Sequence, residues 1–307
     1  MRTRLAAIAA ATTLVLAPVA AHAVTNGVDD DGEHPHVGQL LFYVPDVVDS
    51  PFDDPGAWFN CSGTLVDQTV VVTAGHCTWA TGLEGESTTE GEGDGSGGTD
   101  VWINFEEEPD YNILPPSSTF VPDRNQKRYE AWSAALDASP QWREATAFPH
   151  PEYVDEQFFL HDLGVLELDA AYSPGELGEL PEEGLLDRLA KNKRQTYTAV
   201  GYGLEESGPK TAIGGDTRMR GTLKLVNTRG AFGSDGATAK FSANNGKPHR
   251  GGTCFGDSGG PVFEAGTNQM VGVVSFGVNV TCTGTSGIYR LDQADDLEFL
   301  ETFEVTP

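Results

Sequence analysis

Two short motifs far apart in the chain most constrain its fold, because their chemistry requires them to meet. Residues 256–262 read Gly-Asp-Ser-Gly-Gly-Pro-Val, and residues 73–77 read Thr-Ala-Gly-His-Cys. A serine hydroxyl is a weak nucleophile at neutral pH, so a reactive Ser258 needs an imidazole within hydrogen-bond reach, which His76 can supply. The glycines beside Ser258 let the backbone turn tightly and present N–H groups to a developing negative charge. The pair therefore predicts a fold that places residues 76 and 258 side by side.

The two motifs resemble those of the trypsin/chymotrypsin family of serine endopeptidases, and the resemblance extends over nearly all of the chain beyond residue 23. It implies that His76 is the general base, that Ser258 is the nucleophile, and that the N–H groups of Gly256 and Ser258 form the oxyanion hole. The implied activity is hydrolysis of peptide bonds through an acyl-enzyme, and the implied substrates are polypeptides.

A carboxylate that orients the histidine is expected between the two motifs, and Asp162 is the best candidate. Residues 162–168, Asp-Leu-Gly-Val-Leu-Glu-Leu, resemble the family's aspartate followed by a mostly apolar strand. Residues 149–153, Pro-His-Pro-Glu-Tyr, stand where the family often has a similar segment. Asp155 and Asp169 are weaker candidates, because neither opens an apolar run that would bury it beside the imidazole.

Other interpretations of the serine motif fit less well. The pattern Gly-x-Ser-x-Gly also occurs in the nucleophile elbow of esterases, but there a histidine follows the serine, and none follows Ser258. A subtilisin-like order needs a parallel α/β scaffold, whereas this chain shows short runs separated by Gly and Pro. A catalytically silent binding protein on the same fold stays open as an alternative. Such proteins usually lose a member of the triad, and all three candidates are present here.

The first 23 residues predict a signal peptide. Two arginines precede an apolar run over residues 5–20, which ends in Ala-His-Ala at 21–23. We therefore expect a secreted, extracellular protein that is cut after residue 23, with residues 24–307 forming the mature domain. Val24-Thr25-Asn26-Gly27 resembles the mature N-terminus of the family, whose freed amino group pairs with the acid beside the nucleophile, here Asp257. Export and activation would then be one event.

Four cysteines fit an oxidising compartment and two disulfides, although the sequence alone allows three pairings. The family resemblance implies one of them, with Cys61 bonded to Cys77 and Cys254 bonded to Cys282. A metal site is not predicted from these cysteines, because they contain no C-x-x-C pair and no histidine has ligand-like spacing near them.

Periodicity predicts an all-β protein. The resemblance implies two packed six-stranded antiparallel Greek-key barrels, the first over about 24–175 and the second over about 176–307, with a C-terminal helix. We expect a helix after a capping Asp292, since Ala294, Leu297, Leu300 and Phe303 recur at helical spacing. The expected strands are short β-branched or aromatic runs at 37–44, 63–66, 69–73, 101–105, 196–200, 222–226, 270–276 and 288–291.

Two insertions enlarge the interval between His76 and Asp162. Residues 82–100 are almost wholly Gly, Glu, Asp, Ser and Thr, which predicts a flexible acidic loop. Residues 107–144 carry Pro and aromatic residues and are expected to hold a short helix at about 129–136. No cofactor is predicted. Calcium stays open as an alternative, because oxygen ligands are offered by Asp94, Asp100 and Glu106 to Glu108, but their spacing matches no EF-hand loop.

The formal net charge of −27 makes binding to nucleic acid or anionic membranes improbable. We interpret this charge as a means of keeping the protein soluble outside the cell rather than as a sign of a particular active-site chemistry. It could also steer cationic substrates towards the protein. The expected partners are polypeptide substrates and a protein inhibitor, and we expect a monomer.

Substrate preference is predicted from residues that correspond to the primary pocket of the family. Gly252 stands at the floor position, where trypsin-like members carry an aspartate, so a basic side chain would find no partner. Ser275-Phe276-Gly277 resembles the segment along which substrate backbone pairs, and Gly277 with Gly287 would leave the pocket walls open. An open neutral pocket predicts cleavage after large apolar residues. An acid-selective pocket stays open through Thr253, His249 and Arg250.

Overall fold

A computed structural model describes residues 24–25, 27–45, 47, 54–82, 97–120, 125–208, 211–230, 234, 236–243, 251–279 and 281–307. The expected signal peptide, Asp94, His249 and Arg250 lie outside these residues, as does most of the acidic segment 82–100. The predictions made for them are therefore not addressed by the structure.

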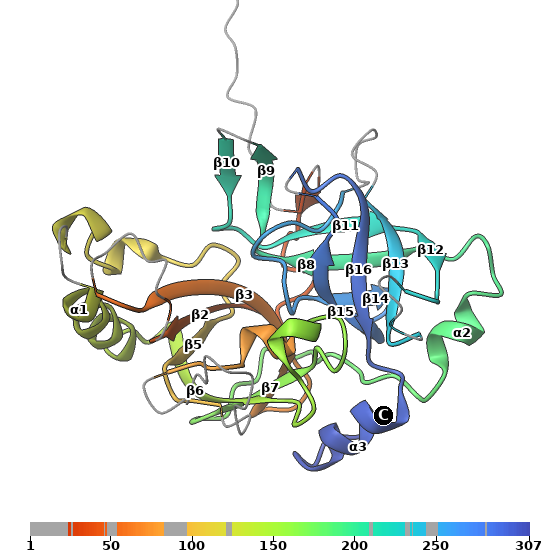
Figure 1. Cartoon of the computed structure of the whole chain (residues 1–307), viewed down its shortest axis with the longest axis horizontal. Coiled ribbons are helices and arrows are strands. Elements are labelled where there is room, and N and C mark those ends of the chain that lie inside the picture. Colours follow the sequence, from red (N-terminus) through yellow and green to blue (C-terminus); the bar gives the residue numbers. More distant parts are fainter. Residues whose placement is uncertain are drawn as a thin grey trace, which may run out of the picture.

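The first half of the chain forms a closed six-stranded barrel (Figure 1). All neighbouring strands are antiparallel, and β5 pairs with β2 to complete the circle. The order is β2-β3-β4-β7-β6-β5, with bounds β2 (Val37–Val44), β3 (Ala57–Leu65), β4 (Val70–Thr73), β5 (Val101–Asn104), β6 (Trp142–Pro149) and β7 (Gly164–Leu168). Apolar residues of these strands form a buried cluster, and all four residues of β4 are buried. The predicted first barrel is confirmed.

The second half, together with β1 from the N-terminal segment, forms one eight-stranded sheet beside the first barrel (Figure 1). Its order is β1-β11-β8-β14-β15-β16-β13-β12, with bounds β1 (Val28–Asp29), β8 (Tyr197–Gly201), β11 (Met219–Leu223), β12 (Leu225–Asn227), β13 (Thr238–Ala243), β14 (Pro261–Glu264), β15 (Met270–Gly277) and β16 (Gly284–Arg290). Within the described residues no pairing joins β12 back to the other edge, so the expected second barrel is a half-barrel. A small hairpin of β9 (Leu204–Gly208) and β10 (Thr211–Gly214) stands apart from it.

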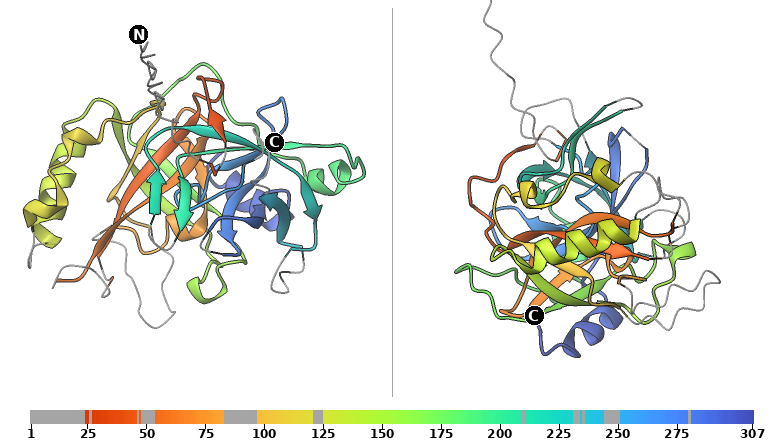
Figure 2. Two further views of the ribbon diagram at one scale, coloured as in Figure 1. Left: turned by 90° about the horizontal axis from the view of Figure 1, so that it is seen from above. Right: turned by 90° about the vertical axis from the view of Figure 1, so that its left-hand side faces the viewer.

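The helices lie outside the strands. In Figures 1 and 2, α1 (Asn125–Asp137) lies against the outer face of the first barrel, where Leu136 packs with Trp102 and Trp142. The other helices are α2 (Leu185–Leu189), α3 (Ala294–Glu301) and the 3-10 turns η1 (Gly75–Cys77), η2 (Tyr111–Ile113), η3 (Ser117–Phe120) and η4 (Asp155–Gln157). No helix in the described part of the chain has both the length and the apolar character needed to span a membrane.

The C-terminal helix is present, but its expected cap is not. Gln293 occupies the cap position of α3 and makes no side-chain capping bond. Asp292 instead accepts hydrogen bonds from the guanidinium of Arg290, at 2.8 and 2.9 Å, and from the backbone N–H of Leu186 at 2.8 Å. Arg290 donates through two nitrogens, a bidentate arrangement that holds this buried carboxylate in place.

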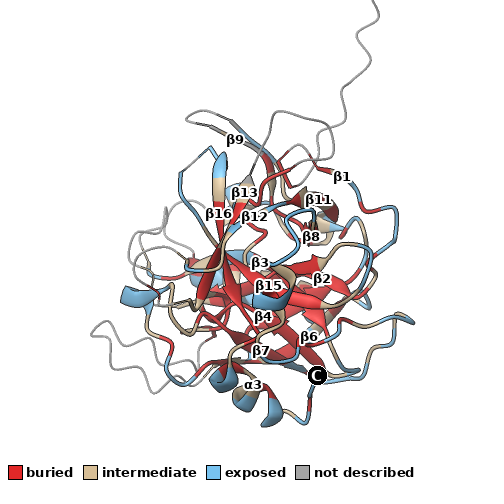
Figure 3. Cartoon of the chain, turned by 90° about the vertical axis from the view of Figure 1, so that its right-hand side faces the viewer, coloured by how far each residue is buried: buried red, intermediate tan, exposed pale blue. Residues whose placement is uncertain are grey.

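The main hydrophobic core runs across both halves (Figure 3). It joins residues of the first barrel such as Leu40 and Val72 with residues of the second such as Val200, Phe263 and Met270. The strands carry most of the buried positions in Figure 3, whereas α3 and the connecting loops are largely exposed. The two halves therefore pack as one unit, and residues from both meet along their shared seam.

Candidate active site

His76 and Asp162 are held together in the first half of the chain. His76 lies in η1, directly after β4, and Asp162 lies just ahead of β7, which pairs with β4. The side chain of Asp162 is fully buried, and its Oδ1 lies 3.0 Å from both the backbone N and the Nδ1 of His76. Because a carboxylate only accepts hydrogen bonds, Nδ1 carries the proton and Nε2 is left as the basic nitrogen.

A second donor fixes the other oxygen of the carboxylate. The hydroxyl of Ser275, on β15, donates to Asp162 Oδ2 at 2.5 Å. The acid is thus held by groups from both halves of the molecule. Neither Asp155 nor Asp169, the weaker candidates, makes a hydrogen bond with His76 among the described residues, and both are exposed.

The electrostatics of His76 follow from these neighbours. Burial lowers the pKa of His76, but the charge and hydrogen bond of Asp162, with a smaller contribution from Asp155, more than offset it. The net result is a pKa above the 6.5 of an unperturbed imidazole. About a quarter of the side chain is exposed, at 27%, so the ring edge can be reached from solvent.

Local structure explains the position of η1. A Cβ on Gly75 would lie 2.8 Å from the ring of Tyr153, so only glycine allows that ring to approach the turn. Tyr153 belongs to the segment 149–153 that the sequence singled out. The disulfide between Cys61 and Cys77 ties the residue after His76 to β3. The turn is therefore clamped from two sides.

The loop that carries Ser258 lies directly against the strand leading to His76. A Cβ on Gly259, where φ is +75°, would meet Thr73 Oγ1 at 2.0 Å and the backbone N of Ala74 at 2.8 Å. The carbonyl of Ser258 accepts the N–H of Ser62 at 2.7 Å. Within the described structure no hydrogen bond joins His76 and Ser258, and such bonds are often long before substrate binds.

The N–H groups of Gly256 and Ser258 are the candidate donors of the oxyanion hole. Gly256 has φ of +98°, and the carbonyl of Phe255 accepts the N–H of Leu204 at 2.7 Å. Because the C=O and N–H of a trans peptide point in opposite directions, the N–H of Gly256 faces away from Leu204. Neither this N–H nor that of Ser258 donates to any described residue. Both are available to stabilise an oxyanion.

Comparison with known protein families identifies the relationship. A family model described as Trypsin matches residues 125–293, which is more than half of the chain. The chain belongs to the trypsin family. The matched stretch contains Asp162 and Ser258, while His76 lies ahead of it. No curated protein sequence matches the chain.

In this trypsin-family protein a cavity of about 350 Å³ opens beside Ser258. No charged side chain lines it within the described residues; its walls are Thr253, Cys254, Phe255, Ser258, Val274, Ser275, Phe276, Gly277, Val278, Asn279 and Cys282. The hydroxyl of Thr253 donates to that of Ser286 at 2.7 Å, so the buried polar atoms at this end of the cavity satisfy each other. A neutral pocket with mostly apolar walls results.

The structure brings only part of the predicted pocket to this cavity. Ser275, Phe276 and Gly277 line it, but Gly252 and Gly287 do not. Gly252 donates its N–H to the carbonyl of Thr25 at 3.1 Å, one residue behind the wall. A Cβ on Gly287 would meet the ring of Phe276 at 2.2 Å, so that ring covers Gly287. Its missing side chain makes room for Phe276 rather than for substrate.

Some residues around the site could not be predicted from the sequence. Phe255 is 56% exposed and Val278 is 49% exposed, and both line the cavity. Phe158 is 37% exposed and packs edge-on against Phe276 at 5.5 Å between ring centroids. Exposed aromatic residues in loops show no periodicity, so only the serine motif beside Phe255 could have drawn attention to it.

Both predicted disulfides are present, with S–S distances of 1.98 Å for Cys61–Cys77 and 2.00 Å for Cys254–Cys282. Cys254 and Cys282 both line the cavity, so their bond joins two of its walls.

The predicted partners in an N-terminal ion pair, Val24 and Asp257, are both buried. Burial raises the pKa of Asp257 to about 7, although the N–H groups of Cys254 and Gly203 donate to its oxygens at 2.8 and 2.9 Å and oppose the shift. No cation in the described part of the chain pairs with Asp257. The side chain of Val24 packs against Met219.

The oxygen ligands proposed for calcium do not converge among the described residues. Asp100 accepts a hydrogen bond from Tyr129 at 2.7 Å, and Glu107 accepts the N–H of Asp31 at 3.0 Å. His150, His161 and Asp296 do bring potential ligand atoms within 4.8 Å of one another. However, His150 Nδ1 already accepts the N–H of Glu152 at 3.2 Å, which makes it a poor metal ligand.

Proposed function

We propose that this chain is a serine endopeptidase in which His76, Asp162 and Ser258 form the catalytic triad. The observation that carries the proposal is the buried Asp162 carboxylate bonded to His76 Nδ1, in the same seam as a serine whose neighbouring N–H groups are free. A histidine held in this tautomer exposes a basic Nε2, which is what an unactivated serine hydroxyl requires.

The proposed reaction uses only protein groups and water. Ser258 Oγ attacks the scissile carbonyl while His76 Nε2 takes its proton, and Asp162 stabilises the imidazolium that forms. The N–H groups of Gly256 and Ser258 bind the oxyanion of the tetrahedral intermediate. His76 then returns the proton to the leaving amine, which yields an acyl-enzyme, and water repeats the sequence to release the acid.

The cavity supports a preference for large apolar residues on the acyl side of the cut bond. Its volume of about 350 Å³ accommodates an aromatic or long aliphatic side chain, and its described walls offer no charge to a basic one. Burial of such a side chain in the cavity contributes about 1.5–3 kcal/mol to the free energy of substrate binding. We further propose that the enzyme works outside the cell as a monomer on polypeptide substrates, after cleavage behind residue 23.

The test is active-site labelling together with variant kinetics. A serine-directed phosphonate should label the wild type and fail to label Ser258→Ala, and Ser258→Ala and His76→Ala should each lower kcat by several powers of ten. Asp162→Asn should be severely impaired through the wrong imidazole tautomer. Asp155→Asn removes the same charge from an exposed site and serves as the matched control.

Two outcomes would contradict the proposal. Absence of phosphonate labelling in folded wild-type protein would favour a catalytically silent binding protein. Normal turnover of Asp162→Asn, combined with an inactive Asp155→Asn, would show that the acid is misassigned.

A further inference from the structure

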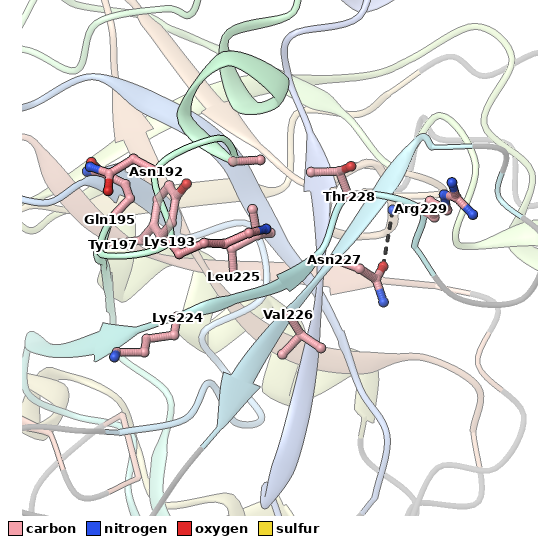
Figure 4. Close-up of a pocket in the computed structure, with 11 residues that line it drawn as sticks. Asn192, Lys193, Gln195, Tyr197, Lys224, Leu225, Val226, Asn227, Thr228 and Arg229 are labelled. Atoms are coloured by element: carbon pink, nitrogen blue, oxygen red, sulfur yellow. Dashed lines mark hydrogen bonds between the residues drawn. The ribbon is translucent and has the colours of Figure 1, made fainter.

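A second cavity lies beside β12 (Figure 4). Its volume is about 260 Å³. One wall is the segment that leads into β8, and the other is β12 with the residues after it; the lining residues are Ala190, Asn192, Lys193, Gln195, Tyr197, Lys224, Leu225, Val226, Asn227, Thr228 and Arg229. None of His76, Asp162 and Ser258 lines it.

The charge of this cavity is opposite to that of the molecule. The chain has 46 acidic residues and only 19 Lys and Arg, yet Lys193, Lys224 and Arg229 share this cavity, and no carboxylate lines it among the residues that the structure describes. Among the described residues none of these three side chains forms an ion pair. The usual screening length of 8–10 Å lets such a local cluster attract an anion although the net charge is −27.

An unsatisfied donor lies between the two walls. Tyr197 is fully buried, and its hydroxyl has no hydrogen-bond partner in the described structure. Figure 4 shows this ring among Asn192, Lys193 and Gln195, all of which line the same cavity. Glu264 pairs with Tyr197 across the sheet but does not line the cavity. A buried hydroxyl without a partner costs roughly 1–3 kcal/mol, which a bound acceptor would recover.

The walls also suit a peptide. β12 is the last strand of the sheet, so one of its sides has no neighbouring strand among the described residues. Val226, in the middle of β12, is 55% exposed, and Leu225 lines the cavity beside it. Extended peptides bind at such edges through their main chain, with side chains selected by the neighbouring pockets. Exposed apolar residues among cationic ones favour a peptide over a purely polyanionic ligand.

We propose that this cavity is an exosite that binds an acidic segment of a partner polypeptide. Side-chain carboxylates of the segment meet Lys193, Lys224 and Arg229, one carboxylate accepts the Tyr197 hydroxyl, and an apolar residue of the segment contacts Val226. The inference does not depend on the proposed catalytic activity, because the exosite shares no residue with the triad or its cavity.

The test measures binding of a fluorescent peptide, acetyl-Glu-Glu-Val-Glu-Glu-amide, to the full chain carrying Ser258→Ala, which prevents cleavage. Fluorescence anisotropy should detect binding that weakens as salt is raised, and the peptide with Gln in place of Glu should bind at least tenfold more weakly. Lys193→Gln combined with Lys224→Gln should weaken binding at least tenfold. Removal of two charges elsewhere, at the exposed Lys127 and the half-buried Arg143, by Lys127→Gln with Arg143→Gln should change it less than twofold.

Tyr197→Phe separates binding from folding. Since the buried hydroxyl has no internal partner, its loss should not lower the unfolding midpoint of the free protein, while peptide binding should weaken severalfold. The proposal is overturned if the Glu and Gln peptides bind alike, if the control pair weakens binding as much as the Lys193 and Lys224 pair, or if no binding occurs at low salt. If inorganic sulfate displaced the peptide with a dissociation constant similar to that of the peptide, the cavity would be a site for small anions. Self-association abolished by the same variants would indicate a second copy of the chain, and either result would also overturn it.

Discussion

The clearest quantitative consequence concerns Asp257 and the chain before Val24. In the unprocessed chain the nitrogen of Val24 is part of a peptide bond, so it offers no charge to the buried carboxylate. The pKa of Asp257 then rises from 3.8 to about 7 through burial. We predict that protein carrying Gly-Ser ahead of Val24 is less stable at pH 8 than protein that begins at Val24, because we expect the freed ammonium of Val24 to pair with Asp257.

The magnitude follows from linkage between protonation and folding. An acid whose pKa is raised by folding binds more protons in the folded state between the two pKa values, so stability falls as pH rises from about 4 to about 7 and is constant above. At about 1.4 kcal/mol per pKa unit, the loss is about 4 kcal/mol. This agrees with the 3–5 kcal/mol expected when a buried ion pair loses one partner.

The assay is urea unfolding of both forms, in the Ser258→Ala background, at intervals from pH 4 to pH 8. Other buried groups such as His36 titrate in both forms and cancel in the difference. The extended form should lose about 4 kcal/mol relative to the form that begins at Val24. In active protein, the extension should also lower turnover, and trimming to Val24 should restore it. If the free energy of unfolding changed with pH in the same way in both forms, with the extension confirmed intact by mass spectrometry, the reasoning would be refuted.

Three further results are expected. His76 must be neutral to act as a base and its pKa is raised, so kcat/KM should decrease on acidification with a midpoint above pH 6.5. Asp162→Asn should move that midpoint to lower pH. A midpoint at or below pH 6.5 in the wild type would contradict the assigned pair. Ser275→Ala removes a hydrogen bond to a buried carboxylate worth roughly 1.5–3 kcal/mol, so kcat should fall about tenfold to a hundredfold in steady-state assays, and unchanged kcat would rule out this support. Cleavage sites in a diverse peptide mixture, read by mass spectrometry, should follow large apolar residues, and a predominance of Arg and Lys would refute the neutral pocket.

Much of the fold could be predicted from local sequence because its strands are short apolar runs. Residues 37–44 were expected as a strand and form β2 with the same bounds. The run 222–226 reads as one strand but is divided at Lys224, where the chain passes from β11 to β12. That division depends on which neighbours the two pieces pair with, which the local pattern does not contain.

In the candidate site, too, some features could be predicted from the sequence and others could not. The order of His76, Asp162 and Ser258 could be recognised because motifs mark each of them. The pocket could not be placed to the residue, since whether Gly252 or Thr253 faces the cavity depends on the path of a loop paired with another part of the chain. Asp292 shows the same limit, because its carboxylate binds Arg290, two residues earlier, and the distant N–H of Leu186, and the helical spacing that follows Asp292 encodes neither contact.

Ser62 links the two halves at the reactive serine. Its N–H binds the carbonyl of Ser258, its hydroxyl donates to the carbonyl of Gly256 at 2.9 Å, and it accepts the N–H of Tyr202 at 3.1 Å. The proposed base and acid, His76 and Asp162, belong to one half of the chain, and the proposed nucleophile, Ser258, belongs to the other. Under the proposed function, neither half can cut a peptide alone, so we expect a newly made chain to gain proteolytic activity only after both halves have folded and docked.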